Sequence, residues 1–141
     1  MKKSNRLQRI ADLSETAEQL AAQALARASE EVERIERQLQ DLESYRDEYL
    51  RPLREPGGGG LGAYQAQKLR LFVGKIEEAL ALIRKKRALA EKQRDHERQQ
   101  WMEQKRRALI TNKVAERARV EEEAMAERAL QREIDDRPRR V

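Results

Sequence analysis

One stretch of helix-breaking residues interrupts this chain, and long runs of helix-forming residues lie on either side of it. The stretch reads Pro56-Gly57-Gly58-Gly59-Gly60-Leu61-Gly62, and Pro52 lies shortly before it. Glycine and proline disfavour helix interiors by about 1 and 3 kcal/mol. We therefore predict an all-α fold, an antiparallel two-helix coiled-coil hairpin. A single domain covers residues 1–141, with helices over about 5–51 and 63–136 and a glycine-rich loop over about 52–62.

Composition supports a thin seam between helices rather than a thick core. Charged residues make up 40% of the 141 residues and aromatic residues only 4%. Such chains form coiled coils when apolar residues recur about every 3.5 positions. Disorder that resolves only on binding a partner is the alternative, and the regular apolar spacing argues against it.

Apolar residues on both sides of the loop step by three and four, as a coiled-coil seam requires. The first helix has a capping residue in Ser4 or Asn5. Its expected seam residues are Ile10, Leu13, Ala17, Leu20, Ala24, Ala28, Val32, Ile35, Leu39, Leu42 and Tyr49. Those of the second helix are Leu69, Val73, Ile76, Leu80, Ile83 and Ala90. Folding about the loop centre puts Leu7 near Arg106 and leaves most of residues 108–141 as an overhanging, charged C-terminal helix.

Near the loop, the apolar set is wider than one seam can cover. Leu71, Phe72 and Ala79 form a strip beside the second seam, and Tyr45 lies to the side of the first. Large rings are enriched at protein interfaces, so these residues predict a docking surface. The alternative is that the rings close the hairpin or pack a second copy into a four-helix bundle.

We expect no catalytic, metal or cofactor site, because two helices form no dry concave pocket. His96 lies in a strongly polar stretch, and the carboxylates at 121–123 and 135–136 are typical of a solvated helix surface. No Lys-Ser or Lys-Thr pair follows the glycines as a phosphate loop requires. The chain has no cysteine and no apolar signal or membrane-spanning segment, which favours a cytoplasmic location.

Nucleic acid is a weak candidate partner. The basic clusters at residues 84–87 and 137–140 carry no aromatic stacking partners. Four consecutive helical residues also point around the whole circumference of the helix, so the first cluster surrounds the helix and does not form a basic strip along one side. With a net charge of +5, salt-sensitive binding to an acidic protein is favoured over nucleic acid.

Several segments together resemble the flagellar export protein FliJ family over nearly the whole chain. They are the segment 38–49 with its Leu42-x-x-Tyr45-Arg46-x-Glu48-Tyr49 pattern, the glycine loop, Leu71-Phe72, residues 76–80, Trp101 followed by residues 105–107, and the charged tail at 133–136. The resemblance implies a non-enzymatic stalk, similar to the central stalk of rotary ATPases, in the flagellar type III export apparatus. Implied partners are the hexameric export ATPase, the cytoplasmic domain of the membrane export gate, and export chaperones. The implied location is the cytoplasm, at the inner face of the membrane and held there through these partners.

The resemblance also implies which residues bind. By matching position, the export-gate contact falls on Gln38, Leu42, Tyr45, Tyr49, Phe72, Ile76, Ala79 and Ile83. For the ATPase we hypothesise, from charge alone, a basic group of Lys2, Lys3, Arg6, Arg9, Lys105, Arg106 and Arg107. A stalk or adaptor of a non-flagellar type III secretion system and a self-assembling structural coiled coil remain alternatives.

Overall fold

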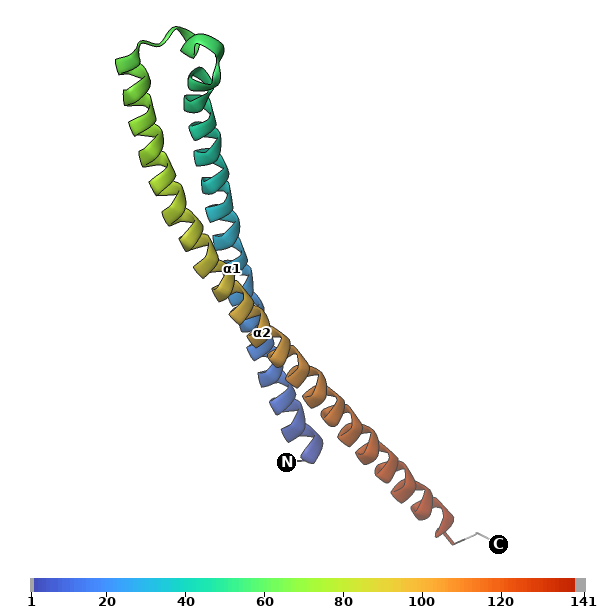
Figure 1. Cartoon of the computed structure of the whole chain (residues 1–141). Helices are drawn as coiled ribbons and strands as arrows, with labels where there is room; N and C mark the ends of the chain where they lie inside the picture. The colour runs from blue at the N-terminus through green and yellow to red at the C-terminus, as the bar shows by residue number, and fades with distance from the viewer. Residues whose placement is uncertain (1, 139–141) are drawn as a thin grey trace. The chain divides into compact units, whose positions relative to one another are not determined.

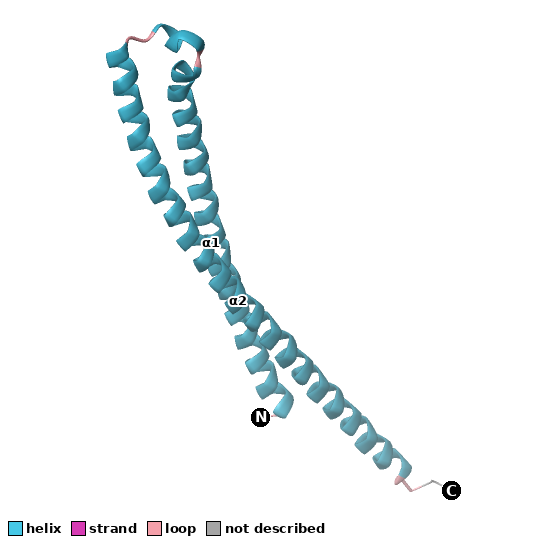
Figure 2. Cartoon of the chain, in the orientation of Figure 1, coloured by secondary structure: helices cyan, strands magenta, loops and turns pink. Residues whose placement is uncertain are grey.

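The computed structural model describes residues 2–138, and two long helices account for most of them. Helix α1 spans Lys3–Arg54, a short 3-10 helix η1 spans Pro56–Gly60, and helix α2 spans Ala63–Asp135 (Figure 1). The part of the chain that the structure describes contains no strand (Figure 2). The prediction of an all-α fold with two helices packed antiparallel is confirmed.

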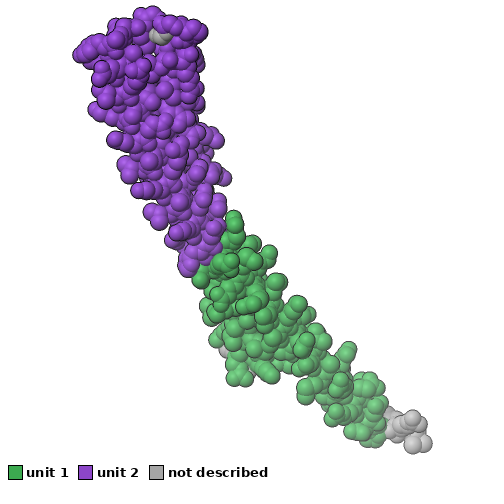
Figure 3. Space-filling view, in the orientation of Figure 1, with its two compact units in different colours: residues 1–23, 98–141 green, residues 24–97 purple. Residues whose placement is uncertain are grey.

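The contacts of the chain group into two units, and each unit contains a segment of both helices. Unit 1 is Met1–Gln23 with Arg98–Val141, and unit 2 is Ala24–Glu97 (Figure 3). The two candidate sites inferred from sequence fall in different units. The export-gate residues all belong to unit 2 and the basic residues all belong to unit 1.

Unit 2 has an aliphatic seam between its two helix segments. Leu39, Ile76 and Leu80 form its centre, and Leu42, Tyr49 and Ile83 pack against them half-buried. Burying each large aliphatic side chain stabilises the unit by about 1.5–3 kcal/mol. Ion pairs Arg46–Glu77 (3.4 Å) and Arg84–Glu43 (3.5 Å) cross the same interface. Pairs as exposed as these contribute little stability but help to specify the register.

The turn begins later than the sequence predicted. Pro52, assigned to the loop from sequence, lies in the last turn of α1, which runs three residues past the expected end at residue 51. Gly59 explains how the chain then reverses. Its φ of +62° is a left-handed conformation, and a Cβ there would lie 3.3 Å from the Pro52 carbonyl oxygen. Only glycine satisfies both conditions without strain.

Unit 1 is held together by small residues instead of large aliphatic ones. Its buried side chains are Ser4, Ala11, Ala108, Ala115 and Ala118. The predicted seam residues Ile10, Leu13 and Leu20 are 50%, 71% and 59% exposed. Their assignment to the seam was wrong.

The assignment was wrong because the buried residues of α1 follow a strict seven-residue repeat that includes small residues. The buried residues of α1 include Ser4, Ala11, Val32 and Leu39, which are separated by multiples of seven. An α-helix that keeps a seven-residue repeat keeps one face inward whatever the size of its side chains. The larger residues at 10, 13 and 20 lie one position off this face.

The predicted pairing of Leu7 with Arg106 is also wrong. Within unit 1, Ser4 contacts Glu122, and Asn112 donates a hydrogen bond to Glu15. Each of these α1 residues lies opposite a later residue of α2 than the sequence prediction assumed. Since Ala115 and Ala118 are buried, the overhanging part of α2 begins well after residue 108. Residues 127–138 are exposed throughout.

Candidate docking surfaces

Three aromatic rings from both helices meet near the turn of unit 2, and we call them the aromatic cluster: Tyr45, Tyr49 and Phe72. Ring centroids of Tyr49 and Phe72 lie 4.9 Å apart, and those of Tyr45 and Tyr49 lie 4.7 Å apart, both edge to face. The two tyrosine hydroxyls share a hydrogen bond of 3.0 Å, which raises the pKa of Tyr45. Edge-to-face contacts and the shared hydrogen bond fix the orientation of the rings.

The aromatic cluster is only partly covered by the chain itself. Tyr45 is 43% exposed and Phe72 40% exposed, whereas Tyr49 is half-buried. A depression of about 500 Å³ opens beside Tyr49 and Phe72, and Leu61, Gln65, Lys68 and Leu69 complete its lining. A fixed, half-exposed ring beside an apolar depression is suited to receive side chains of another protein.

The eight residues assigned to the gate contact do not all lie on the surface. Gln38, Tyr45 and Phe72 are exposed, and Leu42, Tyr49, Ala79 and Ile83 are half-buried. Ile76 is only 6% exposed and belongs to the seam. A partner can therefore reach Gln38, Tyr45 and Phe72 directly, while Ile76 supports the helix pair beneath them.

The seven basic residues assigned to the ATPase contact are all exposed. Five of them form two separate groups, Lys2 with Lys3 and residues 105–107, and Arg6 and Arg9 lie on α1 between these groups. Lys2 and Lys3 lie at the start of α1, where both influence the carboxylate of Glu122. Residues 105–107 lie on α2 between Trp101 and Asn112. These two residues donate hydrogen bonds to Glu18 and Glu15 of α1, respectively. At 1.5 Å per residue, the groups are about 20 Å apart along α1. The expectation that they lie close together is wrong.

The second basic group is partly engaged within α2. The ammonium of Lys105 lies 5.0 Å from the centroid of the Trp101 ring, and Arg107 pairs with Glu103 at 3.2 Å. Trp101 in turn donates its Nε1–H to Glu18 at 2.9 Å. These contacts hold Lys105 and Arg107 each against a residue one turn earlier in α2, on different sides of the helix.

No cluster of metal-ligating side chains and no helix able to span a bilayer occurs within residues 2–138. His96 is exposed. Of the basic cluster at residues 137–140, residues 139–140 lie outside the part of the chain that the structure describes.

The comparison with protein families decides the family. A family model described as "Flagellar FliJ protein" matches residues 2–140, essentially the whole chain. The chain belongs to the FliJ family. Searches of curated proteins and of solved structures found no match. As a member of the FliJ family, the chain is a component of the flagellar export apparatus, so the family favours the flagellar system over the non-flagellar alternative.

Two surfaces of this FliJ-family chain escaped the sequence prediction. In unit 1, large apolar residues that the seam does not use remain exposed, among them Ile10, Leu13, Leu20, Leu109, Ile110 and Val114. In unit 2, Leu82 and Leu89 are exposed on α2, in addition to Leu71, which the sequence analysis had already placed beside the seam. The seven-residue repeat in the sequence could have identified these exposed residues. Once Ser4 and Ala11 are assigned to the seam, the larger residues must face elsewhere.

Proposed function

We propose that this chain is the stalk of the flagellar type III export apparatus and that it docks on the membrane export gate through the aromatic cluster. The observation that carries the proposal is the half-exposed Phe72 ring held edge to face against Tyr49. Burying a ring that its own neighbours already orient loses little conformational entropy on binding. Family membership supports the choice of partner.

Unit 1 is the part that we assign to the hexameric export ATPase. Its support is chemical: two exposed basic groups flank exposed apolar side chains such as Leu13 and Val114. A pore lined by acidic or mixed residues would attract these cations and bury the apolar residues. In this role the chain promotes assembly of the ATPase ring and does not hydrolyse ATP itself. It works in the cytoplasm at the inner face of the membrane, and it also escorts empty export chaperones.

The test is co-purification with the cytoplasmic domain of the gate and, separately, with the ATPase. Tyr45→Ala and Phe72→Ala should each weaken gate binding at least tenfold, as interface anchors do, and leave ATPase stimulation intact. Circular dichroism must show unchanged helicity. If both variants bind the gate normally, or if they lose helicity, the aromatic cluster serves the fold and the docking proposal fails.

A further inference from the structure

The outward side of α2 in unit 2 carries a row of leucines that neither the seam nor the aromatic cluster uses. Leu71, Leu82 and Leu89 are 65%, 67% and 67% exposed. With 3.6 residues per turn, steps of eleven and seven return to within about 20° of the same direction. The three side chains therefore line one face of the helix.

A strip of small residues runs beside the leucines. Gly74, Ala81 and Ala88 are spaced by seven, and all three are exposed. A Cβ added to Gly74 would meet no other part of the described chain within 4 Å. Glycine inside a helix is less favourable than alanine by about 1 kcal/mol, and packing within the chain does not explain it. A small-residue strip beside leucines is suited to the close approach of a second helix.

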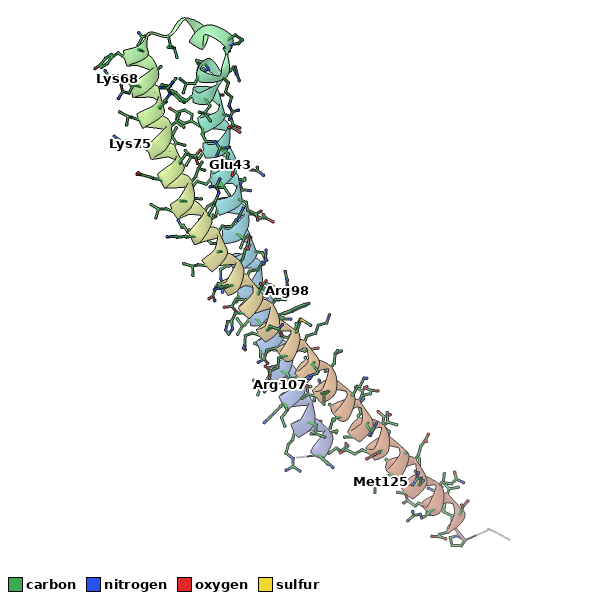
Figure 4. The ribbon with its side chains drawn as sticks, viewed as in Figure 1. Glu43, Lys68, Lys75, Arg98, Arg107 and Met125 are labelled. Carbon is green, nitrogen blue, oxygen red and sulfur yellow. The ribbon has the colours of Figure 1, made fainter. Side chains whose placement is uncertain are left out.

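Lysines flank the leucine row on its other side. Lys68 and Lys75 project from the side of α2 that faces away from α1 (Figure 4). Lys68 lies over the Tyr64 ring at 4.7 Å, and Lys75 and Lys86 have no ion-pair partner among the described residues. Glu78 adds one negative charge, so the face has net positive charge.

The positive charge of this face indicates which kind of partner can bind it. Two copies of the chain would bring two positively charged faces together, which disfavours self-pairing. An anionic bilayer would match the charge, but it gains nothing from a strip of glycine and alanine, since membrane binding grows with buried apolar area. A helix with carboxylates along its edges matches the charge and the shape.

We propose that this outer face, formed by Leu71, Gly74, Ala81, Leu82, Ala88 and Leu89 and flanked by Lys68, Lys75 and Lys86, binds an amphipathic helix of a partner protein with an acidic flank. The partner helix packs its apolar side on the leucines, approaches closely over Gly74, and places carboxylates beside the lysines. The outer face shares only Lys68 with the depression beside the aromatic cluster, so this partner and the export gate contact different residues over most of the helix.

The test uses the full chain and a designed peptide of about four heptads with leucine and alanine at the a and d positions and glutamate at e and g. Titration calorimetry measures its affinity for the wild type and variants. Gly74→Leu should lower the affinity at least tenfold while thermal stability is unchanged or rises, because leucine is the better helix former. Loss of binding in a variant at least as stable as the wild type cannot come from unfolding. Leu82→Ala should also weaken binding, whereas Leu130→Ala, which changes another exposed leucine of α2 in unit 1, should not.

Charge is tested by a second peptide with lysine in place of glutamate, which should bind at least tenfold more weakly. Tyr45→Ala should leave peptide binding unchanged, which separates this surface from the proposed gate contact. The proposal is overturned if Gly74→Leu binds the peptide as the wild type does, or if both peptides bind equally. Binding to phosphatidylglycerol vesicles without binding to the acidic peptide would also overturn it, in favour of a membrane surface.

Discussion

Ser4 of α1 donates two hydrogen bonds to the carboxylate of Glu122 on α2, one from its backbone N–H and one from its hydroxyl. The first turn of any helix has backbone N–H groups without partners inside the helix. Here a residue 118 positions away satisfies one of them. The start of α1 thus depends on the pairing of two helix segments in unit 1, not on a local cap.

The Ser4–Glu122 contact predicts a pH dependence at the start of α1. The hydroxyl and backbone N–H of Ser4 hold the pKa of Glu122 below its ordinary value of 4.5. A carboxyl whose folded pKa is depressed contributes stability above its unfolded pKa, and this contribution is lost as pH falls through the folded pKa. Amide hydrogen exchange at residues 4–6 should therefore accelerate as pH falls below about 4.5, beyond the intrinsic change. Glu122→Gln should exchange faster at neutral pH, and Glu121→Gln serves as the exposed control. Equal protection in wild type and Glu122→Gln would show that the contact does not hold the turn.

A second prediction concerns the heptad seam of unit 1. Ala11→Leu should destabilise the chain by about 1–3 kcal/mol, because a buried alanine at a close helix contact has no room for a larger side chain. Leu13→Ala should change stability by less than about 0.5 kcal/mol, since Leu13 is exposed. Urea unfolding followed by circular dichroism measures both. The opposite order would restore the seam originally predicted from sequence.

The seam of unit 2 should behave as an ordinary aliphatic core. Leu80 is fully buried, so Leu80→Ala should reduce the free energy of unfolding by about 2 kcal/mol or more. Leu82→Ala, two residues along the same helix, should have little effect on stability. A similar loss in both variants would mean that the outer face is covered within the chain.

The turn depends on one glycine more than on the others. Gly59→Ala should destabilise by about 1–2 kcal/mol, because alanine pays for a left-handed φ and meets the Pro52 carbonyl. Gly62 has neither a positive φ nor a neighbour within 4 Å of an added Cβ, so Gly62→Ala is the matched control and should be neutral. Thermal unfolding compares the two, and equal effects would contradict a specific role for Gly59.

The two basic groups of unit 1 should act separately on the ATPase. Groups about 20 Å apart share no partners, so the free-energy effects of their charge reversals should add. Reversing Lys2 and Lys3 in one variant, residues 105–107 in another, and all five in a third tests this by ATPase stimulation at low salt. Strong non-additivity would imply a single shared contact, and full activity of the third variant would remove charge as the mechanism.

Much of the fold was readable before the structure. The proline and glycines at 56–62 predict one turn, and Val32, Ile35, Leu39, Ile76 and Leu80 predict the seam of unit 2, where they are buried. The grouping of Tyr45, Tyr49 and Phe72 near the turn followed from the same helix geometry. In these segments large aliphatic residues recur in steps of three and four along the seam, so their spacing identifies the inward face even though Leu71, Leu82 and Leu89 lie outside it.

The sequence by itself therefore determined the all-α hairpin, its turn and its aliphatic seam, because helix propensity and apolar period act locally along the chain. Only the tertiary structure decided the register and the inward face of unit 1. There, Ser4, Ala11, Ala115 and Ala118 pack while Leu13 and Val114 stay exposed. That choice depends on how closely two helices approach and on polar pairs such as Ser4–Glu122, which join residues far apart in the chain. No local pattern of hydrophobicity records such distances, so the surfaces that unit 1 leaves free for partners became visible only when both helices were in place.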